Sequence, residues 1–373
     1  RNRAFSLIRY TSGEAWTPSA PRRFSNWKVF SMKYTDLAAS ARGNIGPYCK
    51  ACPVCDGRGC KNTVPGPGAK GSGTVAMRNY SAWQGVLLNM DTLHPYFEAD
   101  STCTVLGREL SLPVMIAPVG DVQRHYGDMY DTVGYNECVL CAAEKSGTLA
   151  WTGDGLDGRI MSESCDLISR LGGAGVVTVK PWDAKTLEEK LDHALAARPA
   201  AVAMDIDAAG LPFLKGQNPP AGAKDEGQVA EIAAACHEQG VPFVLKGVMT
   251  PSAAERAVRA GVDGIVVSNH GGRVLDGVPS TAEVLPGIAQ AVGGDLEVLV
   301  DGGIRCGLDV FRALALGAKA CLMCRPFVVA AFGGGEDGVA AFLGQLMAEL
   351  KDSMEMCGAA TIADIDESVL WRG

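Results

Sequence analysis

The sequence has no excess of positive charge and no long run of apolar residues. Its 34 lysines and arginines are outnumbered by 42 aspartates and glutamates, which gives a net charge of −8. This balance offers no overall electrostatic basis for binding nucleic acid. No apolar run approaches the roughly 18–20 residues that a membrane-spanning helix needs, so we expect no membrane span.

No secretory apolar segment is visible in the sequence either, so we expect no signal peptide. Without such a signal, and in a chain of 373 residues, the 13 cysteines are not expected to form a disulfide framework. A reducing cytoplasm fits better, with metal or redox roles for the cysteines that cluster. Hydrophobic residues make up 47% of the chain, which is enough for a sizeable core.

The first 31 residues form the one basic stretch. Arginine and serine are frequent there, and Glu14 is the only acid, as in an organelle transit peptide. However, Met32 followed by Lys33 and Tyr34 resembles a natural start. We therefore favour the interpretation that residues 1–31 are a disordered or non-native leader.

Residues 32–104 are expected to form an irregular N-terminal segment. Within it, residues 43–73 mix glycine, proline, cysteine and serine and end in a stretch rich in proline and glycine, residues 64–73. Such a composition cannot hold a long helix or an interior strand. We expect a loop there, ordered by something other than its own packing.

Residues 105–373 show eight alternations of a short apolar run with a helix-like segment. The predicted strands are Val114–Pro118, Thr148–Thr152, Gly175–Val179, Ala201–Ile206, Pro242–Lys246, Gly264–Ser268, Glu297–Asp301 and Lys319–Cys324. Predicted helices include Pro251–Ala260, Ala282–Val292 and Leu308–Leu316. Nearly continuous apolar strands indicate a parallel sheet that is buried on both faces, an α/β fold. The count of eight, and the lack of a Gly-x-Gly-x-x-Gly turn after the first strand, favour a (β/α)8 TIM barrel over a doubly wound sheet.

Polar residues follow the ends of the predicted strands, where barrel enzymes carry their reactive groups. They are Thr152, Lys180, Asp205, Asp207, Lys246, Ser268, Asn269, His270, Asp301 and Arg325. The loops after the last two strands suggest a phosphate site, since Asp301-Gly302-Gly303 offers bare backbone and Arg305 and Arg325 offer cations.

The segment Ser268–Asp276 places a histidine and an arginine in glycine-rich backbone just past a buried strand. His270 is suited to act as a general base near neutral pH. Arg273 can hold a carboxylate with two parallel hydrogen bonds. The other four histidines, His94, His125, His193 and His237, have no such setting and are expected to be structural or exposed.

Together these motifs resemble the FMN-dependent 2-hydroxy-acid oxidases and dehydrogenases, the relatives of glycolate oxidase and lactate oxidase. The likeness is strong over residues 240–330 and fair over residues 105–205. In the first hundred or so residues it is confined to the surroundings of Leu106–Pro118. The segments that carry it are Phe243–Gly247, Ser268–Asp276, Val300–Arg305 and Asp309–Ala318.

The resemblance implies a role for each matching position. His270 would remove a proton from the substrate, with Asp207 as its carboxylate partner. Arg273 would bind the substrate carboxylate, and Lys246 would stabilise the negative charge of reduced FMN. The implied cofactor contacts are Ala117, Pro118, Val119, Thr152, Lys246, Ser268, Asp301, Gly303, Arg305 and Arg325. The implied activity is oxidation of a small, lactate-like or glycolate-like 2-hydroxy acid, with electrons passing to FMN and then to oxygen or a redox protein. A homo-tetramer is the assembly common in the family.

The substrate side departs from the family pattern. The expected arginine after the fourth strand is missing from residues 208–213, and Lys180 stands where a tyrosine is expected after the third strand. The proline-glycine stretch 64–73 replaces the segment that carries a second tyrosine, and Cys324 replaces the glycine before Arg325. Lys180 could supply the missing cation for a carboxylate, although as a point charge rather than a fork.

Four cysteines lie within twelve residues of the N-terminal segment: Cys49, Cys52, Cys55 and Cys60. This spacing permits structural zinc, a [4Fe–4S] cluster or a metal-free thiol loop, and the sequence leaves all three open. Two other functions also stay open beside hydroxy-acid oxidation. One is an FMN-dependent isomerase of the isopentenyl-diphosphate type, and the other is a non-catalytic, redox-responsive flavin and metal protein.

Overall fold

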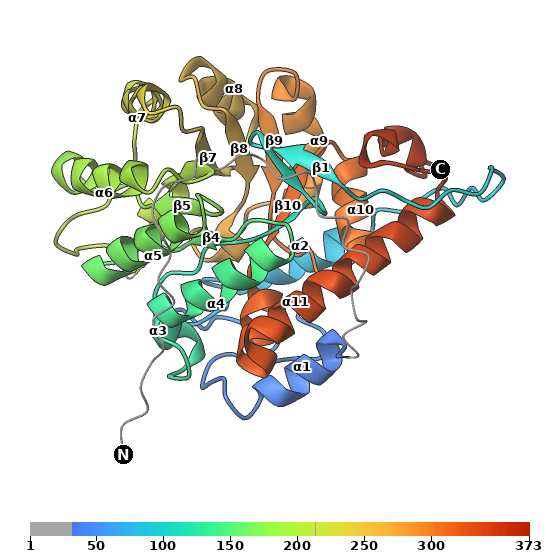
Figure 1. Cartoon of the computed structure of the whole chain (residues 1–373), viewed down its shortest axis with the longest axis horizontal. Helices are drawn as coiled ribbons and strands as arrows, with labels where there is room; N and C mark the ends of the chain where they lie inside the picture. The colour runs from blue at the N-terminus through green and yellow to red at the C-terminus, as the bar shows by residue number, and fades with distance from the viewer. Residues whose placement is uncertain (1–31, 213) are drawn as a thin grey trace.

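The computed structural model describes residues 32–212 and 214–373, and in this part of the chain eight parallel strands close into a barrel (Figure 1). The strands are β3 (Val114–Ile116), β4 (Trp151–Thr152), β5 (Val176–Val179), β6 (Ala201–Asp205), β7 (Phe243–Val248), β8 (Gly264–Val267), β9 (Glu297–Val300) and β10 (Ala320–Met323). β10 pairs with β3, and a parallel bridge from Ile116 to Ala150 joins β3 to the start of β4. The predicted (β/α)8 barrel and all eight predicted strands are confirmed. The leader prediction for residues 1–31 falls outside the described residues.

Helices surround the barrel. They are α3 (Val122–Tyr126), α4 (Thr132–Lys145), α5 (Gly158–Arg170), α6 (Ala184–Ala196), α7 (Glu226–Glu238), α8 (Pro251–Arg259), α9 (Thr281–Val292), α10 (Gly307–Ala315) and α11 (Arg325–Met356). The three helices predicted after the fifth, sixth and seventh strands are confirmed to within one residue at either end. Side-chain caps fix several starts: Ser280 accepts a hydrogen bond from the backbone N–H of Glu283, and Thr250 accepts one from that of Ala253.

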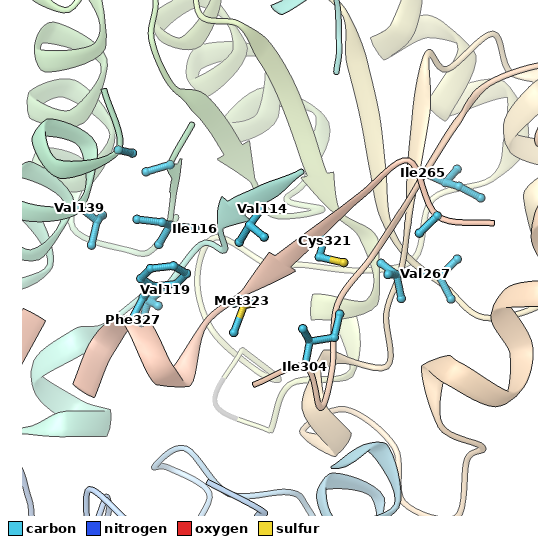
Figure 2. Close-up of a cluster of buried hydrophobic side chains, with 14 of the residues drawn as sticks. Val114, Ile116, Val119, Val139, Ile265, Val267, Ile304, Cys321, Met323 and Phe327 are labelled. Carbon is cyan, nitrogen blue, oxygen red and sulfur yellow. The ribbon is translucent and has the colours of Figure 1, made fainter. Parts of the chain in front are cut away.

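Successive strand residues point alternately into the barrel and toward the helices. Met115 and Leu322 belong to the cluster that fills the barrel interior, together with Trp151 and small residues such as Ala203. The flanking residues of β3, β8 and β10 belong to the outer hydrophobic cluster, which also contains Val139 of α4 and Phe327 of α11 (Figure 2). Both faces of the sheet are thus apolar, which explains why the strands read as continuous apolar runs rather than alternating ones.

A short hairpin closes the barrel at the N-terminal ends of its strands. It is formed by β1 (Cys103–Val105) and β2 (Arg108–Leu110), and its residues Val105, Leu106 and Leu110 join the interior cluster. The backbone N–H of Leu106 donates a hydrogen bond to the Glu297 carboxylate at the start of β9. With that end covered, ligands have access only from the C-terminal ends of the strands.

The N-terminal segment is more regular than predicted. Residues 43–73 contain no helix or strand, as expected, but helices α1 (Tyr34–Ala41) and α2 (Thr74–Gln84) flank them. α1 packs along α11, and Figure 1 shows the two side by side. The prediction of an irregular segment over all of residues 32–104 was therefore wrong for these two helices, whose apolar faces are buried against distant parts of the chain.

The proline-glycine stretch 64–73 is ordered by docking onto the barrel loop 268–276. Lys70 donates from its backbone N–H to the carbonyl of Gly272 (2.8 Å) and from its side chain to the carbonyl of Val274 (3.1 Å). Ser72 donates to both oxygens of the Asp276 carboxylate. For residues 64–73, the expectation that something other than the loop's own packing orders it is confirmed, and the contacts come from the loop that carries His270.

Helix α2 fixes the loops at the barrel mouth. Asn79 and Asn269 exchange two amide hydrogen bonds of 2.8 Å each in a buried position. The Trp83 indole donates to the carbonyl of Gly302 at 2.7 Å. Because buried polar groups of this kind are fully paired, they hold α2 and the loops after β8 and β9 in one arrangement.

Helix α11, with 32 residues, is long and apolar enough to cross a membrane by length and composition alone, which the sequence analysis did not anticipate. However, 61% of its most apolar stretch is buried inside the protein. The helix also bends at Gly335, whose φ of 61° is not helical. A helix in the core of a protein can be as long and as apolar as a membrane span. The burial and the bend of α11 are typical of such a core helix.

Replacing Gly272 with alanine tests how tightly the N-terminal segment packs on the barrel loop. Gly272 has φ of +81°, and an added Cβ would lie 2.7 Å from Cβ of Val75 and 2.8 Å from Cβ of Ala69. Gly277 has a similar φ of +75° with nothing within 4 Å, so it is a matched control. We expect Gly277→Ala to cost about 1 kcal/mol of unfolding free energy and Gly272→Ala about 2 kcal/mol more. Equal losses in denaturant titrations would contradict this packing.

Candidate active site

A cavity of about 340 Å³ opens at the C-terminal ends of the strands, within the size range of ligand sites. Eleven of the residues given a functional role from the sequence line it: Ala117, Pro118, Val119, Lys180, Lys246, His270, Arg273, Asp301, Gly303, Arg305 and Arg325. The barrel thus gathers in one place residues that span more than two hundred positions of the sequence. Asp207 lies directly behind the cavity wall, in contact with His270.

Lys246, at the end of β7, carries a buried positive charge. Its Nζ lies 2.9 Å from Oδ1 of Asp205 and 3.6 Å from Oδ2 of Asp301. Burial by itself would lower the pKa of Lys246, but these two carboxylates raise it above its ordinary value. Burial would likewise raise the pKa of Asp205, and the charges of Lys246 and His270 hold it below its ordinary value. The pair stays ionised, and the ammonium is a fixed cation at the cavity wall.

His270 follows β8 and is held by two aspartates. Its Nδ1 lies 3.0 Å from Oδ1 of Asp207 and 3.6 Å from Oδ1 of Asp205. A carboxylate at Nδ1 holds the ring proton there and leaves Nε2 as the hydrogen-bond acceptor. The backbone of His270 has φ of +56°, a left-handed conformation that costs a non-glycine residue roughly 1–2 kcal/mol. Strain of this kind clusters at active sites, where the surrounding structure enforces it.

Arg273 reaches the cavity from the same loop. Its Nη2 lies 3.1 Å from Nε2 of His125, and the backbone N–H of Gly66 donates to the other ring nitrogen at 2.9 Å. Burial, and then the nearby Arg273, lower the pKa of His125 to about 2, so the imidazole is neutral. His125 therefore lies against the guanidinium without adding a competing charge, and it stands between Arg273 and the proline-glycine stretch.

Lys180 projects into the cavity at the end of β5, where its Nζ comes close to Gly120. Its backbone N–H donates to Oδ2 of the buried Asp154 at 2.8 Å, and the indole of Trp182 donates to the same oxygen at 2.6 Å. Lys190 pairs with the other oxygen of Asp154 at 2.6 Å. Since Lys190 neutralises Asp154, the ammonium of Lys180 remains available to an anion in the cavity.

The remaining predicted contacts divide into two groups. Ala117, Pro118, Val119 and Gly303 line the cavity. Thr152 and Ser268 are buried but do not line it. The hydroxyl of Thr152 faces the carbonyl of Val176 at 3.5 Å, and that of Ser268 accepts from the backbone N–H of His270 at 3.1 Å. Ser268 thus contributes by holding the strained histidine.

The two predicted phosphate-binding arginines are placed differently. Arg325, the first residue of α11, lines the cavity and donates from Nη2 to the carbonyl of Gly271 at 3.3 Å. Within the described part of the chain, its Nη1 is buried without a hydrogen-bond partner. Arg305 also lines the cavity, but its guanidinium donates to the carbonyl of Cys55 at 2.7 Å and to that of Ile304 at 2.6 Å. Arg325 is therefore the arginine whose free donor can take an anion.

The four cysteines singled out from the sequence lie together. Cys49, Cys52, Cys55 and Cys60 line a second, smaller cavity next to the first one. Arg325 and Pro67 line both cavities and so belong to the wall between them. The cysteine loop, residues 49–60, is therefore part of the surroundings of the site.

Three residues of the site were not assigned a role from the sequence. Asp205 pairs with Lys246; its place at a strand end was noted, but no role followed from it. Tyr126 lines the cavity, and burial raises its pKa well above the ordinary value, so its hydroxyl is neutral. His125, expected to be merely structural or exposed, contacts Arg273. No sequence pattern marks Tyr126 or His125, because both lie on a short helix between β3 and α4.

Comparison with known proteins agrees with this geometry. The family of FMN-dependent dehydrogenases matches residues 67–213 and 215–372. The L-lactate dehydrogenase of Stenotrophomonas maltophilia (strain K279a) is 56% identical over 129 residues, and that of Acinetobacter baylyi is 54% identical over 129 residues. Each match covers 35% of this chain and 34% of the relative, so the chain aligns with about a third of the length of these enzymes.

Solved structures are similar over a longer stretch. Mandelate oxidase with benzoyl-formic acid superposes with a TM-score of 0.72 at 28% identity, covering 88% of this chain and 95% of that one. Mandelate oxidase with (S)-2-phenylpropionate gives the same TM-score of 0.72 at 27% identity, again covering 88% and 95%.

Removing the carboxylate of Asp205 tests the buried ion pair. Asp205→Asn leaves the buried Lys246 ammonium with only the more distant Asp301 carboxylate, so we expect a loss of about 3 kcal/mol of unfolding free energy at pH 7. The control is Glu226→Gln, which breaks the exposed Glu226–Arg259 pair and should cost much less, because solvent screens that pair. Denaturant titrations check both variants, and a loss at Asp205 no larger than at Glu226 would contradict the role of the pair.

Proposed function

Because the chain belongs to the family of FMN-dependent dehydrogenases, which matches most of its length, we propose that it oxidises a small 2-hydroxy acid to the corresponding 2-oxo acid. The observation that carries the proposal is the His270–Asp207 pair, 3.0 Å apart, at the wall of a cavity that also holds the cations Lys246 and Arg273. A base, a fixed positive charge and a carboxylate-binding arginine are what this oxidation requires.

The residues at the cavity fit FMN. The buried, unpartnered Nη1 of Arg325 suits a phosphate oxygen, and it lies at the N-terminus of α11, where anions are favoured. Gly302 and Gly303 supply bare backbone, and Ala117–Val119 line the same cavity, where they would contact the ring. When bound, FMN would accept the hydrogen of the α-carbon together with two electrons.

His270 is the proposed base for the substrate hydroxyl. With Nδ1 held by Asp207, its Nε2 would take the proton from that hydroxyl, and the carboxylate would stabilise the imidazolium that forms. Asp205, 3.6 Å from the same nitrogen, adds a second negative charge. Lys246 offsets that charge and keeps a cation where negative charge develops in the cavity.

The substrate carboxylate would lie between Arg273 and Lys180. Arg273 offers a planar fork that lies against His125, and Lys180 offers a point charge. The lactate dehydrogenase and mandelate oxidase likenesses support a 2-hydroxy acid as the substrate class, and we take lactate and glycolate as its simplest members. They do not favour the isomerase alternative, and a retained base and cation give no support to a non-catalytic role.

The function is tested by substrate reduction of the bound flavin. We expect the protein purified without oxygen to contain FMN and to lose its flavin absorbance near 450 nm when L-lactate or glycolate is added. His270→Ala should keep FMN but reduce it about 10²–10⁴ times more slowly, because the base is gone. The exposed His193→Ala is the control and should behave as the wild type. Normal flavin reduction by His270→Ala would exclude the base assignment.

Lys180→Met tests the substrate-binding cation. Loss of a charge that binds substrate and transition state alike should raise KM about 10- to 100-fold and leave kcat within a few-fold. Lys185→Met, on the exposed face of α6, is the matched control. Steady-state kinetics check both variants, and an unchanged KM for Lys180→Met would show that Lys180 does not bind the carboxylate.

A further inference from the structure

The cysteine loop is built around a cavity of its own. The side chains of Cys49, Cys52, Cys55 and Cys60 line it, together with Tyr34. The centre of a water molecule could occupy about 20 Å³ of this space, whereas a single water needs about 10–15 Å³ on the same measure. The four cysteines thus line one shared space, which has room for at least one small ligand.

The spacing of the sulfurs does not suit a single zinc ion. Four thiolates at the zinc–sulfur distance of about 2.3 Å in a tetrahedron are about 3.8 Å apart. Over residues 32–212 and 214–373, the one group of three or more such ligand atoms within 4.8 Å of one another is Asp205, Asp207 and His270. No three of the cysteine sulfurs are that close. In a polynuclear centre each thiolate binds a different metal atom, so the four sulfurs need not converge on one point.

The charges around this cavity suit an anionic cluster. A [4Fe–4S] cluster with four thiolates carries a net negative charge. Arg325 lines the cavity, and Arg305 donates from Nε to the carbonyl of Cys55 at 2.7 Å. The Tyr34 hydroxyl is buried without a hydrogen-bond partner in the described part of the chain and can donate to a cluster sulfur.

We propose that Cys49, Cys52, Cys55 and Cys60 bind a [4Fe–4S] cluster. Such a cluster also orders residues 43–73, which have no helix or strand of their own. Because Arg325 and Pro67 line both cavities, a single layer of side chains separates the cluster from the larger cavity. From that position the cluster can take electrons from a flavin in the larger cavity and pass them out of the protein.

The role of the cluster rests on the proposed function. Oxidation of one 2-hydroxy acid breaks its Cα–H and O–H bonds, forms the C=O bond, and releases two electrons and two protons. The cluster changes its charge by one electron at a time. It therefore passes the two electrons singly to an external one-electron acceptor protein, so that two acceptor molecules are reduced per substrate and two protons go to the solvent.

Metal and sulfide analysis of the whole protein tests the site directly. After anaerobic purification and incubation with ferrous iron and sulfide, we expect about four iron and four acid-labile sulfide per chain, with brown absorbance that dithionite bleaches. An electron paramagnetic resonance signal should accompany the reduction. Bound zinc without iron, or neither metal, would overturn the proposal.

Two variants separate ligands from other cysteines. Cys52→Ser/Cys55→Ser should lose most of the iron and sulfide, while Cys357→Ser, at the far end of α11, should keep both. Retention of the full cluster by the double variant would exclude these ligands. Iron and sulfide content are read independently of activity, so a double variant that unfolds leaves the wild-type result decisive.

Flavin content, measured on the same samples, distinguishes this proposal from the proposed function. FMN that lactate or glycolate reduces, in a protein without iron, would overturn the cluster and leave the function. A cluster in a protein without FMN would do the reverse. If substrate bleaches the flavin but produces no reduced-cluster signal in rapidly frozen samples, the electron-exit role is excluded.

Discussion

The buried ion pair between Lys246 and Asp205 is the interaction on which the site depends. Each charge would be strongly disfavoured alone in this position, because the surrounding strands exclude water. With Nζ of Lys246 2.9 Å from Oδ1 of Asp205, both groups stay ionised. The same carboxylate oxygen lies 3.6 Å from Nδ1 of His270, so its negative charge also acts on the imidazole. The same pair therefore supplies a fixed cation at the cavity and part of the negative charge that would stabilise the imidazolium formed when His270 takes a proton. Asp207 adds the direct hydrogen bond that sets the tautomer.

The barrel mouth is completed by the N-terminal segment. Helix α2 locks the loops after β8 and β9 through the Asn79–Asn269 amide pair and the Trp83 indole. The proline-glycine stretch 64–73 docks on the loop that carries His270, and Gly66 holds His125 against Arg273. A segment that lacks regular structure over most of its central part thus acts as one wall of the cavity. This arrangement explains how the barrel can match the family at His270 and yet have different residues around the substrate.

The position of the cysteine loop gives that wall a second property. A group held by the four cysteines contacts Arg325, and Arg325 also faces the larger cavity. One guanidinium would therefore be shared between a cofactor phosphate bound in the larger cavity and a group held by the cysteines in the smaller one. Such sharing ties the charge state of the two cavities together, since a change of charge in one alters the electrostatic free energy of binding in the other.

The sequence by itself determined the barrel, because eight apolar runs with intervening helix patterns leave few other ways to bury both faces of a parallel sheet. It also determined His270, Arg273, Lys246 and Asp207, since residues at strand ends must meet at one rim. Only the tertiary structure decided the rest. Helices α1 and α2 follow from contacts with distant segments, and local propensity does not encode those contacts. His125 and Tyr126 gain their places from the packing of a short connecting helix. Arg305 turns toward Cys55 because the cysteine loop offers a carbonyl there, and that pairing joins residues 250 positions apart in the chain.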